Sequence, residues 1–168
     1  MPIETAIALV VCTIFVYSSI SKIISYRSFE ETIAKLQFPK GLASVVIAAE
    51  LVVPALLLIE PTNREGKIGV LLLVFAFCFA AVWAIVKKLN VPCNCFGEST
   101  AELLGWGTII RLLPLLLGGV AIAYTDSRIS LMDLQLLDVL STVFIAIGVV
   151  TIYSFWNNKD ALRVEGTK

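Results

Sequence analysis

Two cysteines separated by a single residue, Cys93 and Cys95, are the side chains of this sequence best suited to chemistry. Pro92 restricts the backbone beside them, whereas Asn94 and Gly97 tolerate the positive φ of a tight reversal, so the chain is predicted to turn here. A disulfide needs Cα atoms about 4.4 to 6.8 Å apart, which an i, i+2 pair reaches only if the backbone bends. Such a bridge would be strained and easily reduced, which favours thiol–disulfide exchange over a structural disulfide.

A helix is expected to begin shortly after this motif. Ser99 and Glu102 have the S-x-x-E spacing of a capping box, and an apolar run follows them. The partial positive charge at a helix N-terminus stabilises a thiolate. Cys95 is nearer to that terminus, so we expect it to be the more reactive thiol and Cys93 the outer one. The order of attack stays open.

The composition predicts an integral membrane protein. Of the 168 residues, 58% are hydrophobic and 15% are charged, and the mean hydropathy of +0.92 lies outside the range of ordinary soluble domains. Acidic and basic residues balance and form no basic tract, which argues against nucleic acid as a partner. Because the sequence has no histidine, Ser-His and Cys-His catalytic pairs are excluded. Chemistry must use thiols, carboxylates or a cofactor.

The fold class predicted is all-α, with a compact bundle of five transmembrane helices in one membrane-embedded domain over residues 1–168. Five apolar segments are long enough, at roughly 20 residues, to span a bilayer of about 30 Å. Short polar connections join them and make neighbouring helices antiparallel. The segments are Ile3–Ile24, Leu42–Ile59, Lys67–Val86, Leu104–Tyr124 and, approximately, Leu134–Trp156.

The longest connection runs from Ser25 to Gly41. Its apolar residues, among them Phe29, Ile33 and Leu36, recur at helical spacing between charged ones. The connection is therefore predicted to form a short amphipathic helix at the membrane interface. An ordinary solvated linker is the alternative.

Glu50 and Arg111 are predicted to lie deep inside membrane spans, where charge is expensive and often functional. At about 1.5 Å per residue they lie about 12 and 10 Å below the same face, so they are predicted to pair. The pair would either fix helix packing alone or support function. Pro54 and Pro114 lie further along the same helices, where a kink would open space between them. A quinone there is a candidate electron acceptor, although the sequence holds no specific quinone motif.

The remaining cysteines, Cys12 and Cys78, are predicted to lie near mid-membrane. They could form a second redox pair if their helices are neighbours. The alternative is that each is a small hydrophobic side chain, as lone cysteines in apolar helices usually are.

With these residues in view, the chain resembles the MauE family of the MauE/DoxX group of redox-associated membrane proteins. The resemblance covers most of the sequence from Ser18 to Arg111, and Leu112 stands where the family often has asparagine. It is carried by Ser18–Lys22, Arg27-Ser28-Phe29, Pro39, Glu50, Cys93-x-Cys95-Phe96-Gly97, Gly105-Trp106 and Arg111.

The resemblance implies a membrane partner for thiol–disulfide chemistry that works beside a thioredoxin-like protein. The family is named for maturation of the disulfide-rich subunit of methylamine dehydrogenase, but that substrate does not transfer with the motif. The leading hypothesis is a membrane thiol–disulfide oxidoreductase in which Cys93 and Cys95 exchange disulfides with a thioredoxin-like or other disulfide-containing protein.

Two alternatives belong to other classes. One is a non-enzymatic membrane adaptor that anchors a soluble redox protein, with the Cys93–Cys95 disulfide as a structural staple; strain in the short ring argues against it. The other is a soft-metal site, because a CxC pair can hold Cu(I) or zinc. Zinc sites normally need four ligands, and the other two cysteines are predicted to lie far away, so no metal is expected.

The protein is expected in the plasma membrane, and two arguments place its CxC loop on opposite sides. In helix order, this loop shares a face with the Ser25 to Gly41 connection and the C-terminal tail. The family role favours an extracytoplasmic loop, where disulfides persist, whereas the positive-inside rule favours the cytoplasm. Basic residues on or next to the CxC face are Lys22, Arg27, Lys35, Lys40, Lys87, Lys88, Lys159, Arg163 and Lys168, against Arg64, Lys67 and Arg128 opposite.

Overall fold

The computed structural model describes residues 3–89, 91, 106–124, 137, 139–148 and 151, apart from the side chains of residues 107 and 111. All regular structure in these ranges is helical, which confirms the all-α prediction for the part described. The elements are α1 (Ile3–Ile24), α2 (Tyr26–Lys35), α3 (Leu42–Leu58), the 3-10 turn η1 (Glu60–Thr62), α4 (Asn63–Val86) and α5 (Trp106–Tyr124). A further apolar helix spans Val139–Gly148.

Two helical stretches are long and apolar enough to cross a membrane, namely Ile3–Ile24 and the continuous Glu60–Val86. Three other apolar helices, Leu42–Leu58, Thr108–Tyr124 and Val139–Gly148, are shorter. Within the described ranges, the helical fold is therefore established, whereas five transmembrane helices are not confirmed.

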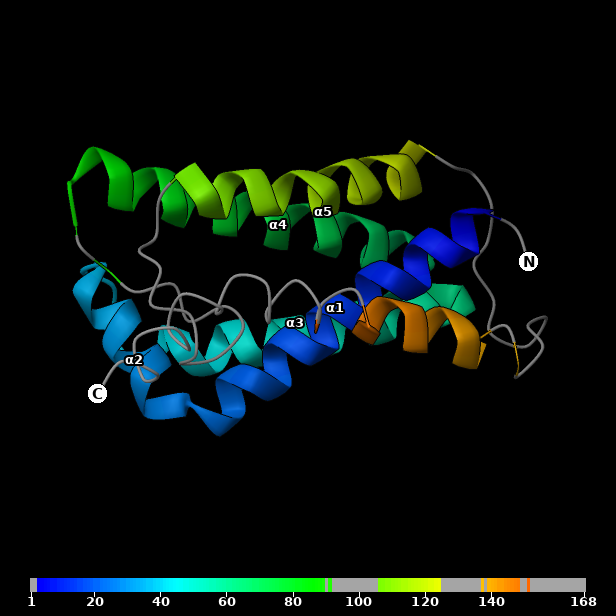
Figure 1. Ribbon diagram of the computed structural model, residues 1–168, viewed down its shortest axis with the longest axis horizontal. Coiled ribbons are helices and arrows are strands. Elements are labelled where there is room, and N and C mark those ends of the chain that lie inside the picture. Colours follow the sequence, from blue (N-terminus) through cyan, green and yellow to red (C-terminus); the bar gives the residue numbers. More distant parts are fainter. Residues whose placement is uncertain are drawn as a thin grey trace, which may run out of the picture.

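The helices α1, α3, α4 and α5 form the bundle. α3 packs against both α1 and α4, and α5 packs against α4 and α1. Figure 1 shows α4 and α5 lying side by side, with α1 and α3 along the other side of the bundle. Their inner faces meet in one apolar cluster, to which all four helices contribute buried side chains. Its buried members include Val11, Phe15, Leu57, Val70, Val74 and Ile122.

The α2 helix lies at the end of the bundle where α1 and α4 end and α5 begins (Figure 1). Its buried Phe29 and Ile33 pack against Ala43 and Ile47 of α3, while Arg27, Glu31 and Lys35 are exposed. The amphipathic helix predicted between Ser25 and Gly41 is therefore present. Its apolar stripe is covered by the protein's own helices, and its position at a membrane interface stays a prediction.

The connection between α3 and α4 is itself helical. A polar linker was predicted up to Gly66, but α4 begins at Asn63, directly after η1. The Asn63 side chain explains the early start, because its Nδ2 donates to the carbonyl of Leu57 at 2.6 Å. Thr62 Oγ1 donates to the carbonyl of Leu56 at 3.0 Å. These side chains bind carbonyls at the end of α3 that have no partner within the helix, and so they hold the two helices close together.

At Gly66 the backbone of α4 lies very close to that of α3. A Cβ atom at this position would lie 2.3 Å from the backbone nitrogen of Leu57. We expect Gly66→Ala to lower the free energy of unfolding by about 1–3 kcal/mol, because the backbone of α3 must move. Unfolding of the purified protein in detergent micelles measures this loss. Gly41→Ala is the control, since a Cβ there meets nothing within 4 Å. Equal stability of the two variants would contradict the close approach.

Candidate functional site

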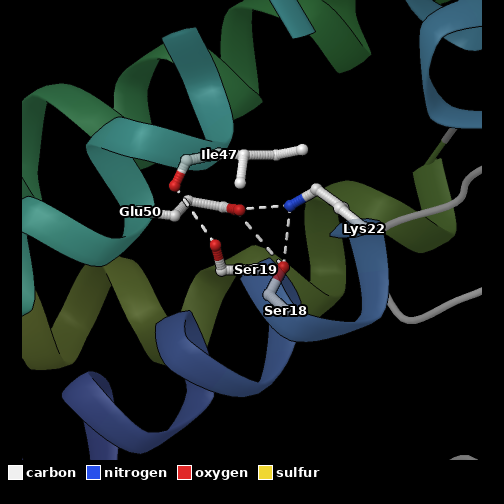
Figure 2. A network of polar contacts seen from close by, with 5 residues as sticks. All are labelled: Ser18, Ser19, Lys22, Ile47 and Glu50. Carbon is white, nitrogen blue, oxygen red and sulfur yellow. Dashed lines mark hydrogen bonds and ion pairs between the residues drawn. The ribbon is translucent and has the colours of Figure 1, made fainter. Parts of the chain in front are cut away.

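A buried polar network joins the C-terminal half of α1 to the middle of α3 (Figure 2). Ser18, Ser19 and Lys22 share one side of α1, because Lys22 follows the two serines by four and three positions, the spacing that brings helical side chains together. Ile47 and Glu50, three residues apart, present their polar groups from α3. All of these polar side chains are buried. The network therefore lies within the bundle, in a segment that is otherwise apolar.

Lys22 and Glu50 form an ion pair at the centre of this network. Lys22 is 1% exposed and Glu50 is 0% exposed. Ser18 supports both partners, since its Oγ accepts from Lys22 Nζ at 2.7 Å and donates to Glu50 Oε1 at 3.3 Å. Ser19 Oγ donates to the carbonyl of Ile47 at 3.1 Å and so fixes α1 against α3. Lys22 of α1 thus neutralises the buried carboxylate of Glu50 on α3.

The Lys22 ammonium also faces two aromatic rings. Its Nζ lies 5.4 Å from the centroid of Phe29 in α2 and 5.0 Å from that of Phe77 in α4. Both distances allow cation–π attraction, which is strongest where water is absent. Lys22 is therefore the point at which four helices converge, because its partners lie on α3, α2 and α4 as well as on its own helix.

The second carboxylate oxygen of Glu50 makes no such contact in the part of the chain that the structure describes. Glu50 Oε2 is buried and has no hydrogen-bond partner among the described residues. A carboxylate can accept several hydrogen bonds, and an unsatisfied buried acceptor costs about 1–3 kcal/mol. The pair is thus held by one oxygen, and the other can still accept a hydrogen bond.

The predicted pairing of Glu50 with Arg111 stays a prediction. The backbone of Arg111 belongs to α5, but its side chain lies outside the described residues. Glu50 is deeply buried near the middle of its helix, as the sequence indicated, and the partner that the structure describes is Lys22. Sequence reasoning missed Lys22 because it was counted as an interfacial charge at the end of a span. The available signal was its place in the last turn of an apolar helix, one turn after Ser18 and Ser19.

Cys93 and Cys95 lie outside the described residues, so the structure does not test their role. It does describe the chain just before them. Val91 is 1% exposed and packs in a cluster with Leu36, which follows α2, and Ala84 of α4. Only Pro92 separates Val91 from Cys93 in the sequence. The approach to the CxC motif is therefore anchored at the end of the bundle that carries α2.

Cys12 and Cys78 belong to the same apolar cluster, Cys12 as a buried member and Cys78 packed against it. Both thiols are free. Cys12 Sγ lies 3.9 Å from the carbonyl oxygen of Pro54, within reach of a weak hydrogen bond. The structure thus brings both cysteines into one region of the core without a disulfide. A second redox pair there stays a prediction.

In the part of the chain that the structure describes, all helices are consistent with a helical membrane protein, because long apolar helices surround a buried ion pair. The chain belongs to the MauE family, described as methylamine utilisation protein MauE, with residues 2–124 matched. No match was found among curated proteins or among solved structures. The match includes Ser18, Lys22, Glu50, Cys93 and Cys95, so the resemblance to this family predicted from the sequence is confirmed.

Proposed function

We propose that this protein is a membrane thiol–disulfide oxidoreductase that uses Cys93 and Cys95. The observation that carries the proposal is the family match, because it extends across both cysteines. The short spacing of the two thiols adds a chemical reason, since a disulfide in so small a ring is strained and easily exchanged.

The anchored chain before the motif supports the same proposal. Val91 is buried against Leu36 and Ala84, so residues close to the thiols are fixed to the bundle. A rigid attachment helps an exchange reaction, because the attacking thiolate must reach the disulfide along a defined direction. The thioredoxin-like or disulfide-containing partner would then dock at the end of the bundle that carries α2.

In the proposed reaction, one thiolate attacks a disulfide of the partner protein and forms a mixed disulfide. The second cysteine then attacks the sulfur of the first cysteine in the mixed disulfide. This step releases the partner as a dithiol and leaves a Cys93–Cys95 disulfide. Two electrons pass from this protein to the partner in that direction. The reverse sequence oxidises the partner instead.

Thiol trapping with mass spectrometry tests the proposal. We expect Cys93 and Cys95 to interconvert between dithiol and disulfide at a potential above about −300 mV, the limit below which structural disulfides typically fall. A potential below that limit would favour the adaptor with a structural disulfide. Metal that co-purifies and blocks trapping would favour the soft-metal site. Cys12 and Cys78 are first replaced by alanine, so that only the motif reacts.

The side of the membrane that carries the CxC motif is a separate prediction. Lys22 no longer counts as a surface charge, because it is buried and paired with Glu50. The remaining described basic residues still favour a cytoplasmic motif by the positive-inside rule, whereas the family role favours the opposite side. The basic residues that are exposed at the end of the bundle that carries α2 are Arg27, Lys35, Lys40, Lys87 and Lys88.

On the charge argument, we expect a membrane-impermeant maleimide to label Cys93 and Cys95 only after the cells are permeabilised. The measurement uses the variant in which Cys12 and Cys78 are alanine. A cysteine placed in the Glu60–Gly66 region is the control for the opposite face. Labelling of the motif in intact cells would reverse the assignment and favour oxidative maturation of substrates outside the cytoplasm.

A further inference from the structure

A pocket of about 290 Å³ lies between α2, α3, α4 and the start of α5. Its wall is almost entirely apolar and includes Phe29, Leu36 and Phe77. Three polar side chains, Lys22, Thr32 and Thr108, also line it. The volume is at the small end of the range for ligand pockets, enough for one substituted ring but not for a long chain as well.

The pocket opens toward the outer apolar surface of the bundle. Ala76 and Phe79 of α4 both line the pocket, and both are exposed. Exposed Leu72, Phe75 and Val82 continue the same apolar surface along α4. A ligand would therefore enter sideways from the lipid, and an apolar tail could remain outside along α4. This geometry favours a lipophilic ligand.

The polar end of the ligand is indicated by Lys22. An ammonium has three N–H groups, and among the described residues Ser18 and Glu50 accept from two of them. No acceptor is assigned to the third among the described residues, and Lys22 lines the pocket together with Phe29 and Phe77. Because Glu50 already balances the charge, an uncharged acceptor such as a carbonyl suits this position better than an anion. Flat aromatic walls also favour a planar ring. A quinone, which is an apolar planar ring with carbonyl groups, fits this description.

We propose that this pocket binds a quinone, which accepts the electrons released when Cys93 and Cys95 form a disulfide. The inference rests on the proposed function. In the step, two S–H bonds break and one S–S bond forms, so the thiols lose two electrons and two protons. The quinone gains the same two electrons and two protons, and its two carbonyls become hydroxyls. Leu36 connects the two places, since it lines the pocket and packs against Val91, two residues before Cys93.

Binding of decylubiquinone to the purified full-length protein in lipid nanodiscs tests the pocket. We expect Ala76→Phe to weaken binding by about tenfold or more, because the larger side chain fills the opening. Ala48→Phe is the matched control and should bind as the unmodified protein does, because Ala48 is exposed on α3 and is not part of the pocket wall. Thermal unfolding of both variants shows whether they remain folded.

A second measurement needs no substitution. Decylbenzene has the same tail on a planar six-membered ring that carries no carbonyls, so we expect it to compete poorly with decylubiquinone. Equal affinity would show a general apolar site, filled by lipid as readily as by quinone, and would overturn the proposal. Equal loss of affinity in Ala76→Phe and Ala48→Phe would overturn the assigned location.

The test also separates this inference from the proposed function. If the dithiol reduces a soluble disulfide but decylubiquinone neither binds nor oxidises it, the quinone inference fails and the exchange function stands. If decylubiquinone binds in the pocket but Cys93 and Cys95 never change oxidation state, both the proposed function and the electron-transfer role fail. Formation of the Cys93–Cys95 disulfide together with an equal amount of quinol is the expected result.

Discussion

Lys22→Met is expected to destabilise the protein by about 3–5 kcal/mol, because it leaves the Glu50 carboxylate buried without its cation. Glu50→Gln should cost a similar amount, since it leaves the ammonium unpaired beside Phe29 and Phe77. The double variant should recover much of the loss, because neither charge remains. Unfolding of all four proteins in detergent gives the coupling energy as a double-mutant cycle.

A matched control is available on α2. Lys35 is exposed, so Lys35→Met should change stability by less than about 0.5 kcal/mol. Arg111→Met completes the comparison, because strong coupling with Glu50→Gln would support the pairing that the sequence predicted. Additive losses for Lys22→Met and Glu50→Gln would contradict the buried pair. A double variant that folds but no longer transfers electrons would show that the charges also support function.

The helices were predictable because long apolar runs leave few alternatives. The bounds of α1 agree with the predicted span, and α2 forms where apolar residues recur at helical spacing. The start of α4 was missed because Asn63 binds a carbonyl of the preceding helix, a contact between segments that hydropathy does not register. From the sequence alone, a polar residue such as Asn63 predicts a linker, even where its side-chain hydrogen bond extends a helix.

The ion pair was only half predictable. The burial of Glu50 follows from its place within an apolar run, but the choice between Lys22 and Arg111 depends on how each helix is rotated about its axis. Hydropathy indicates how deep a residue lies in a span, but not how the helix is rotated about its axis. Lys22 lies near the end of α1, where a long side chain usually extends toward water. In this bundle α2 covers that end, so the ammonium turns inward to Glu50.

The pocket depends on the same packing of α2. An amphipathic helix can satisfy its apolar stripe at a lipid surface or against protein, and the sequence does not distinguish the two. Prolines in α3 and α5 suggested space beside Glu50 and Arg111. In the described residues, the pocket next to Lys22 is lined mainly by residues of α2, α3 and α4. The quinone therefore stays a proposal. The pocket proposed for it has defined lining residues, which substitutions can alter.

Cys93→Ser and Cys95→Ser are each expected to abolish exchange with a thioredoxin-like protein, because one thiol cannot both attack a disulfide and resolve the mixed product. The two variants should still differ. Loss of the resolving cysteine leaves the attacking thiolate in place, so that variant should accumulate a covalent complex with the partner. Non-reducing electrophoresis and intact mass measure the complex, and we expect it with Cys93→Ser if Cys95 attacks first.

Cys12 and Cys78 provide the internal comparison, because both lie in the apolar core and neither belongs to the motif. If the motif acts alone, Cys78→Ala should retain exchange activity, while a specific loss of activity in a folded Cys78→Ala protein would support the second redox pair. Full activity of both serine variants of the motif would remove the oxidoreductase function altogether. A trapped complex in only one of them would establish the order of attack, which neither spacing nor helix position decides.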